Sequence, residues 1–168
     1  MYRLFAPDMQ AETLFDIDTN ALRTRGIRGI ILDLDNTIVP WDNSDVCPRI
    51  ADWLRQLTAQ GFRVAVVSNN WQKRVRAICV AFGLPFVSRA YKPARAGFRR
   101  ALASIGLEAS ETAVIGDQLF TDVLGGNRMG MYTIWVKPLT AQEFIGTRVH
   151  RRLERVAVRY LKARGLMR

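Results

Sequence analysis

Apolar runs alternate along the chain with segments whose apolar residues recur at helical spacing, which predicts strands and helices in alternation. Strands are expected at residues 26–35, 62–70, 84–90, 111–118 and 131–138. Helices are expected at residues 47–61, 71–83, 92–106 and 120–130. Strands that alternate with helices pair in parallel through right-handed crossovers, so the pattern predicts an α/β fold with a doubly wound parallel sheet.

Two kinds of pattern support these predictions. The first strand, GIRGIILDLD, is an unbroken apolar run, which is typical of a strand buried on both faces. In the segment 47–61, Ile50, Trp53, Leu54 and Leu57 recur at helical spacing. Pro93 is expected in the first turn of the helix at 92–106. No repeat, low-complexity stretch or linker interrupts the pattern, so residues 1–168 are expected to form one domain.

Composition narrows the class of protein further. A chain of 168 residues with 49% hydrophobic content can bury a full core. Cys47 and Cys79 lack the spacing of a metal site and are expected to be buried thiols in a reducing, cytoplasmic compartment. No apolar run approaches the roughly 18 residues of a membrane span. The first residues also lack the apolar core of a signal peptide.

Basic residues concentrate at the C-terminal end of the chain. The formal net charge is +10. Residues 148–168 hold eight Lys or Arg and one Glu, so seven of the ten positive charges lie there. This charge indicates an anionic partner, which can be a lipid surface, a nucleic acid or a phosphorylated substrate. A solvated helix face would show the same pattern.

A basic amphipathic helix is expected at about residues 141–164. Val149, Leu153, Val156 and Tyr160 form one apolar stripe on it. The basic side chains around this stripe are Arg148, Arg151, Arg152, Arg155, Arg159 and Lys162. The helix can lie on an anionic membrane, or it can pack the stripe on the domain and leave the basic side chains in water. The pattern does not decide between these two arrangements.

Polar side chains stand where the predicted strands end. They are Asp33 and Asp35 after the first strand, Ser68 and Asn69 after the second, Asp117 after the strand at 111–118, and Lys92 at the start of the helix at 92–106. Each residue alone is typical of a turn or an exposed surface. Ligands of such sheets bind beyond the carboxyl ends of the strands, so together these residues predict a phosphate and metal site there.

The residue types fit the transfer of a phosphoryl group. Converging carboxylates repel one another unless a cation lies between them, and a set of oxygen ligands favours Mg²⁺. One aspartate can attack phosphorus and form an aspartyl phosphate. A second carboxyl, two residues further on, can donate a proton to the leaving oxygen and later activate water. A lysine and a serine hydroxyl can stabilise the phosphoryl oxygens.

The order of these motifs resembles that of the haloacid dehalogenase (HAD) superfamily of phosphatases. The four motifs are Asp33-Leu-Asp35-Asn-Thr37, the strand-end Ser68, Lys92, and GDQLFTD with Asp117 and Asp122. Together with FAPDMQAETLFDID, VVSNN, YKPA and LGGNRMGMYTIWVKPL, they are similar to the YqeG family over residues 1 to about 160. That family is similar to phosphatidylglycerophosphate phosphatases, which remove the terminal phosphate to give phosphatidylglycerol.

The resemblance implies a role for each matching residue. Asp33 is implied as the nucleophile and a Mg²⁺ ligand. Asp35 is implied as the general acid and base, and its main-chain carbonyl as a metal ligand. An acid at this position favours a phosphatase over a dehalogenase, because only the phosphatase has a leaving alcohol to protonate. Phosphoryl binding is implied for Ser68, Asn69, Lys92 and Thr37, and Thr37 is also implied to support the loop. Asp117 is implied as a metal ligand, and Asp122 is implied to orient metal waters or Lys92.

Short spacers between the motifs leave no room for a large cap domain. Thirty residues separate Thr37 from Ser68, and 23 separate Ser68 from Lys92. An open site suits a phosphate displayed on something large, such as a lipid head group. Trp41 and Trp71 follow the first two motifs and can either flank the entrance or pack the loops.

The leading hypothesis is a Mg²⁺-dependent phosphatase that dephosphorylates phosphatidylglycerophosphate, an anionic phospholipid, at the inner face of a membrane. The alternative is a phosphatase of a soluble ester or a nucleic-acid end, although no aromatic-basic motif supports a nucleic acid. A non-catalytic binding module would be expected to lack an essential aspartate or the lysine, and both are present. The sequence does not indicate an oligomeric state.

Overall fold

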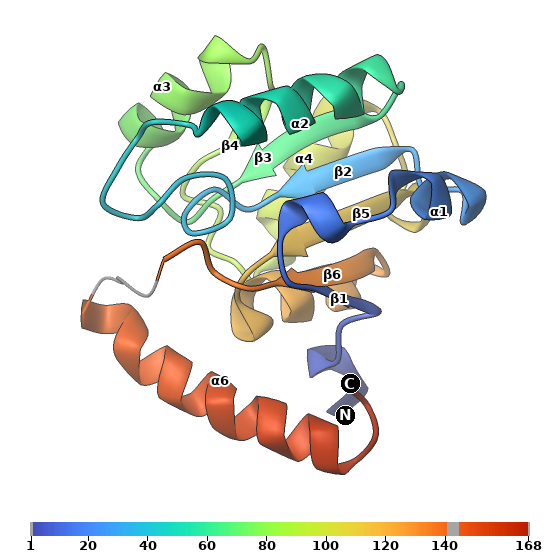
Figure 1. Cartoon of the computed structure of the whole chain (residues 1–168), viewed down its shortest axis with the longest axis vertical. Coiled ribbons are helices and arrows are strands. Elements are labelled where there is room, and N and C mark those ends of the chain that lie inside the picture. Colours follow the sequence, from blue (N-terminus) through green and yellow to red (C-terminus); the bar gives the residue numbers. More distant parts are fainter. Residues whose placement is uncertain (1, 141–144, 168) are drawn as a thin grey trace.

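The computed structural model describes residues 2–140 and 145–167, in which a sheet lies between layers of helices (Figure 1). All strand pairs are parallel, in the order β1-β6-β5-β2-β3-β4. The strands are β1 (Met9–Ala11), β2 (Gly29–Leu32), β3 (Arg63–Val67), β4 (Phe86–Val87), β5 (Thr112–Gly116) and β6 (Tyr132–Val136). The predicted α/β fold with a doubly wound parallel sheet is confirmed.

Each central strand contributes side chains to two cores. Ile30 and Leu32 of β2 belong to the core on one face of the sheet, and Ile31 belongs to the core on the other face. This explains why the strands read as continuous apolar runs rather than as alternating ones. The first face is covered by α1 (Thr19–Thr24), α2 (Pro48–Ala59) and α3 (Gln72–Ala81), and the second by α4 (Arg95–Ile105) and α5 (Leu124–Met129).

Two elements at the N-terminal end are not predicted by the hydrophobic pattern, namely α1 and β1. The three residues of β1 are half-buried, too few for a recognisable period, and they pair with the distant β6. Short 3₁₀ turns occur at Tyr2–Phe5, Leu14–Asp16 and Ala109–Glu111. The described residues show no inserted cap, because only α2 lies between β2 and β3, and only α3 and β4 lie between β3 and α4.

Some predicted boundaries need correction. The helix expected at 92–106 begins at Arg95, so Pro93 lies before it rather than in its first turn. The helix expected at 120–130 begins as a π-helical turn, η4 (Leu119–Val123), and continues as α5. Cys79 is buried as expected, but Cys47 is exposed, because it ends the solvent-exposed loop that leads into α2.

The C-terminal helix α6 (Ile145–Ala163) lies beside the β1 and β6 side of the sheet (Figure 1). Leu161 is buried against Leu119 and Val123 of η4. Leu153 and Val156, which belong to the predicted apolar stripe, are 56% and 65% exposed. At these two positions, therefore, the predicted apolar stripe does not pack on the domain.

Several residues of the predicted basic helix lie outside the described part of the chain. Residues 141–144 are not described, nor are the side chains of Arg148, Val149, Arg151, Arg152 and Arg155. No helix within the described residues combines the length and apolarity that crossing a membrane requires.

Candidate active site

The predicted site residues lie at the carboxyl edge of the sheet. Asp33 follows β2 directly, Ser68 follows β3, and Asp117 follows β5. The chain runs from β2 outward through β3 to β4, and β5 lies on the other side of β2. The order of the strands thus reverses between β2 and β5, which is where ligands bind in open parallel sheets. Asp33 and Asp117 stand at this point.

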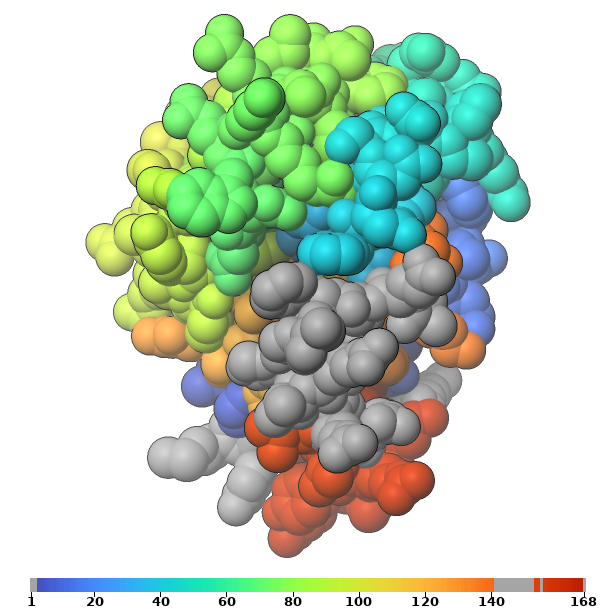
Figure 2. Space-filling view, turned by 90° about the vertical axis from the view of Figure 1, so that its left-hand side faces the viewer, coloured from blue at the N-terminus to red at the C-terminus, as the bar shows by residue number. Residues whose placement is uncertain are grey.

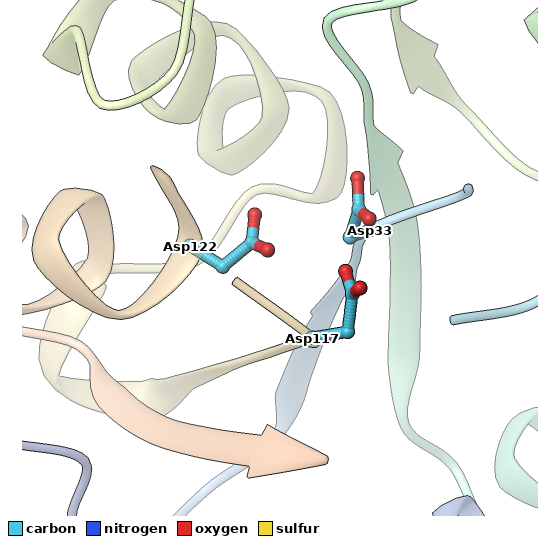
Figure 3. Close-up of side chains that lie close together, drawn as sticks. All are labelled: Asp33, Asp117 and Asp122. Carbon is cyan, nitrogen blue, oxygen red and sulfur yellow. The ribbon is translucent and has the colours of Figure 1, made fainter. Parts of the chain in front are cut away.

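Three buried carboxylates converge there. Each of Asp33, Asp117 and Asp122 offers an oxygen, and these oxygens lie within 4.8 Å of one another. Figure 3 shows the three side chains directed into one common space. Asp122 approaches closely only because residue 116 is glycine: a Cβ atom there would lie 2.3 Å from Asp122 Oδ2. The π-helical turn η4 thereby holds Asp122 against the end of β5.

Lys92 links two of these carboxylates. Its ammonium donates a hydrogen bond to Asp33 Oδ1, and another of 2.7 Å to Asp122 Oδ1. The side chains of Lys92, Asp33 and Asp122 are only 3%, 7% and 2% exposed. An ammonium has three donors, two of which are engaged by described residues, so the third can donate to a ligand.

Burial and neighbouring charges shift the pKa values of this group. Burial raises the pKa of Asp33 well above its ordinary value, Asp122 and Asp117 raise it further, and Lys92 opposes the rise. Burial acts to lower the pKa of Lys92, but the carboxylates of Asp122 and Asp33 outweigh it and raise that pKa. The lysine therefore stays charged at neutral pH, whereas ionisation of Asp33 is disfavoured.

The donor set fits a divalent cation. Three carboxyl groups converge on one ammonium in a buried space, so a cation bound there would offset the negative charge that their ionised forms bring together. Hard oxygen donors of this kind suit Mg²⁺, and a cation beside Asp33 would favour its ionised form. The main chain of Asp117 is held in place by Trp135, whose Nε1 donates to the Asp117 carbonyl at 2.9 Å.

The side chain of Asp35 belongs to a second polar cluster. Its carboxylate accepts from Arg74 Nε at 3.0 Å, from Asn70 Nδ2 at 3.1 Å and from Ser68 Oγ at 3.3 Å. These bonds keep the Asp35 side chain on the β3 side of the site. Asp35 therefore joins the loop that follows β2 to the end of β3 and the start of α3.

Arg74 is a residue that the sequence analysis did not single out. Besides Asp35, its guanidinium donates to Ser44 Oγ at 3.0 Å and to the carbonyls of Pro40 and Asn43 at 2.9 and 2.7 Å. It thus ties the start of α3 to the loop after β2, and these two segments lie side by side in green and cyan in Figure 2. Only its position at the start of a helix on the carboxyl edge could have pointed to it.

Asn69 and Thr37 have different surroundings. The Asn69 side chain accepts from the Lys92 main-chain N–H at 2.7 Å and donates to the Lys92 carbonyl at 3.2 Å, so it fixes the backbone that carries the lysine. The Thr37 hydroxyl is buried and has no hydrogen-bond partner among the described residues. It belongs to a tight turn in which Asn36 adopts a left-handed φ of 60°.

Exposed aromatic and basic side chains follow the strands on this edge. Trp41, Trp71 and Tyr91 are all exposed. The Arg89 guanidinium lies 3.9 Å from the centre of the Trp71 ring, a cation–π arrangement. The two tryptophans are therefore not packed within the core.

The amino-acid sequence is similar to those of known proteins. Residues 4–130 match the family model of the haloacid dehalogenase-like hydrolases. YqeG of Bacillus subtilis (strain 168), named a probable phosphatase, is 40% identical over 163 residues, which are 97% of this chain and 95% of that protein. The chloroplastic phosphatidylglycerophosphate phosphatase 1 of Chlamydomonas reinhardtii is 32% identical over 161 residues, and covers 90% of this chain.

The chain spans 60% of the length of that algal enzyme. Among solved structures, the cobalt-bound deoxy-D-mannose-octulosonate 8-phosphate phosphatase of Haemophilus influenzae has the same fold, with a TM-score of 0.53 and 18% identity. That match covers 67% of this chain and 69% of the other. The chain therefore belongs to the haloacid dehalogenase-like hydrolases and, within them, to the YqeG family, which confirms the predicted class of phosphoric monoester hydrolases.

Proposed function

We propose that the protein is a Mg²⁺-dependent phosphatase that acts through an aspartyl phosphate and converts phosphatidylglycerophosphate to phosphatidylglycerol at an anionic membrane surface. The observation that carries the chemical part is Lys92, buried between Asp33 and Asp122 beside Asp117. This arrangement combines a nucleophile, a cation-binding set and a fixed positive charge in one place.

In the proposed reaction, an Asp33 carboxylate oxygen attacks phosphorus while the bond to the leaving oxygen breaks. Asp35 donates its proton to that oxygen, which leaves as the alcohol. Asp35 then takes a proton from water, the water oxygen attacks phosphorus, and the bond between Asp33 and phosphorus breaks to release inorganic phosphate. Lys92 and Ser68 would bind the phosphoryl oxygens, and Asn69 would keep Lys92 in position.

Mg²⁺ would be held by Asp33, Asp117 and the Asp35 carbonyl, with Asp122 orienting its waters or Lys92. When bound, it would neutralise charge on the phosphoryl oxygens. Asp33 also has to be ionised to attack, and its raised pKa opposes this in the metal-free protein. The positive charges of Lys92 and of the cation would together favour the ionised form of Asp33.

The chemical part is tested with Asp33→Asn, which keeps the size of the side chain but replaces the nucleophilic carboxylate by a neutral amide. Wild-type protein with Mg²⁺ should hydrolyse a general substrate such as para-nitrophenyl phosphate, and the variant should show no turnover. Exposed Asp52→Asn serves as the control for loss of one carboxylate. Unchanged activity of Asp33→Asn would contradict the mechanism.

The proposal of a lipid substrate rests on two relatives and on the exposed aromatic residues of this protein. The Chlamydomonas relative and a chloroplastic and mitochondrial relative from Arabidopsis thaliana, which is 26% identical over 170 residues, are both named phosphatidylglycerophosphate phosphatases. The chain covers 49% of the Arabidopsis protein. Exposed aromatic residues on the carboxyl edge, such as Trp71 and Tyr91, suit a membrane interface.

The helix α6 is the proposed membrane contact. Leu153 and Val156 are exposed, and so are Arg159 and Lys162 on the same helix. Apolar side chains next to cations are the pattern with which a helix lies on an anionic bilayer. The alternative in which a stripe containing Leu153 and Val156 packs on the domain does not apply to these residues.

Vesicle sedimentation tests this contact. The protein should sediment with vesicles of phosphatidylglycerol at low salt, and less with phosphatidylcholine. Val156→Asp should weaken sedimentation, whereas Val80→Asp, at a valine of similar exposure on α3, should not. Equal sedimentation of both variants, or none by the wild type, would contradict a role for α6. The soluble-ester and nucleic-acid alternatives would then gain support.

A further inference from the structure

The helix α6 reaches the candidate active site through one buried side chain, Glu154. Its exposed fraction is 4%, whereas Arg159 and Lys162 of the same helix are exposed. Glu154 Oε1 accepts hydrogen bonds from the main-chain N–H groups of Leu119, at 2.7 Å, and of Phe120, at 3.4 Å. These two residues open the turn η4.

The turn η4 also carries Asp122. The first N–H groups of a helical segment have no partner within it, so other groups have to accept from them. Glu154 accepts from Leu119 and Phe120, and Asp122 Oδ2 accepts from the N–H of Gln118 at 3.2 Å. Two carboxylates, one from α6 and one from the site, therefore complete the start of the same turn.

A buried carboxylate needs such partners. An isolated charge in the interior is costly, but N–H groups at the start of a helical segment supply both hydrogen bonds and a favourable dipole. Leu161 and Met167 add apolar contact, because both are buried in one cluster with Leu119 and Val123. The seating of α6 and the conformation of η4 therefore depend on each other.

A chain of direct contacts then leads to the proposed nucleophile. Glu154 fixes the start of η4, η4 carries Asp122, and Asp122 Oδ1 accepts from Lys92 Nζ at 2.7 Å. The same ammonium donates to Asp33. Displacement of η4 by a fraction of an ångström would therefore change the position of the lysine and of the carboxylate beside it.

We propose that Glu154 is a positioning residue, through which the seating of α6 sets the geometry of Asp122, Lys92 and Asp33. This rests on the proposed function, because it assigns the control of that same site to a helix on the surface. Glu154 itself touches no substrate. Its effect is transmitted through the length and direction of the side chain rather than through its charge.

Three substitutions test this proposal. Glu154→Gln keeps the accepting oxygen at the same reach, Glu154→Asp keeps the charge but shortens the side chain, and Glu154→Ala removes both. Lys162→Ala, at an exposed position of the same helix, is the matched control. For each protein, kcat and KM would be measured with para-nitrophenyl phosphate, and Mg²⁺ affinity by titration calorimetry without substrate.

Glu154→Asp and Glu154→Ala should lower kcat and Mg²⁺ affinity by about tenfold or more, the range seen when groups that orient a metal site are removed. KM should also rise, because Lys92, which Asp122 of η4 holds, is one of the groups proposed to bind the phosphoryl oxygens. Glu154→Gln should retain most of the wild-type kcat and affinity. If Glu154→Ala unfolds, the comparison of Glu154→Gln with Glu154→Asp still tests the proposal.

The proposal is overturned if Glu154→Asp preserves kcat and Glu154→Gln does not, because charge alone would then account for the role of Glu154. It is also overturned if folded Glu154→Ala behaves like Lys162→Ala in both measurements. Failure of the proposed function is recognised separately, since the wild type itself would then release no phosphate. Mg²⁺ affinity remains a readout in that case.

Discussion

Replacing Lys92 by methionine tests the electrostatic description of the site in depth. Methionine keeps an unbranched apolar stem but removes the ammonium, so Asp33 and Asp122 remain as buried carboxylates without it. Removing one partner of a buried ion pair costs about 3–5 kcal/mol of folding free energy. This is a large share of the roughly 5–15 kcal/mol by which domains are stable.

The loss of folding free energy should be measured by urea unfolding at pH 7 with a chelator present, and the melting temperature by heating in the same buffer. For a chain of this size, about 2–4 °C of melting temperature accompany each kcal/mol, so the melting temperature should fall by about 6–20 °C. Two further signatures arise from the same charges. The loss should shrink at pH 5, where protonation of Asp33, whose pKa is raised by burial, removes one uncompensated charge, and Asp33→Asn in the same chain should restore part of the stability.

Lys137→Met is the matched control, because Lys137 pairs with Glu12 in the open, with side chains 60% and 70% exposed. An exposed pair contributes less than about 1 kcal/mol. If Lys92→Met destabilises the metal-free protein no more than Lys137→Met does, the buried lysine is not the counter-charge that holds the site together. Mg²⁺ should stabilise the Lys92 variant relative to its metal-free form, provided that it binds the folded state.

Other consequences concern pH, the loop after β2 and the thiols. Burial and two neighbouring carboxylates raise the pKa of Asp33, so its protonated form contributes stability that is complete below the unfolded pKa of about 4 and is lost as pH rises through the folded pKa. The metal-free stability of wild type minus that of Asp33→Asn should therefore fall as pH rises above 4, and a flat difference would contradict this. Arg74→Ala should increase amide hydrogen exchange in the loop at 40–44 and lower kcat, and unchanged exchange would show that the loop needs no tether. Burial raises the pKa of Cys79 to about 12, so a thiol reagent at pH 8 should modify Cys47 and leave Cys79 unmodified in the folded protein; equal rates would refute this.

The position of the candidate site could be predicted from the sequence because the strands of a parallel sheet all end at the same edge. Asp33 and Asp117 each stand one residue beyond an apolar run, and both runs are strands of one sheet. Once the strands are parallel, the residues at their carboxyl ends are brought together. The pattern of apolar residues therefore locates these carboxylates without any side-chain coordinates.

The contacts between the motifs could not be predicted in this way. Arg74 meets Asp35 only because α3 starts beside the loop that follows β2, and such tertiary contacts leave no periodic signal. Glu154 looks like a solvent-exposed residue of a basic helix, since nothing local shows that it meets the main chain of Leu119. Leu153 and Val156 share a periodic stripe, but periodicity does not reveal which face of α6 meets the domain.

The most direct test of the proposed function compares substrates under identical conditions. Wild-type protein with Mg²⁺ would be given phosphatidylglycerophosphate in anionic vesicles, glycerol 3-phosphate in solution, and an oligonucleotide with a terminal phosphate. Phosphate release would be measured for each, with Asp33→Asn as the blank. The lipid should give the highest kcat/KM by a wide margin, and no phosphate should be released by the variant. A higher kcat/KM for either soluble substrate, or release by Asp33→Asn, would contradict the proposal.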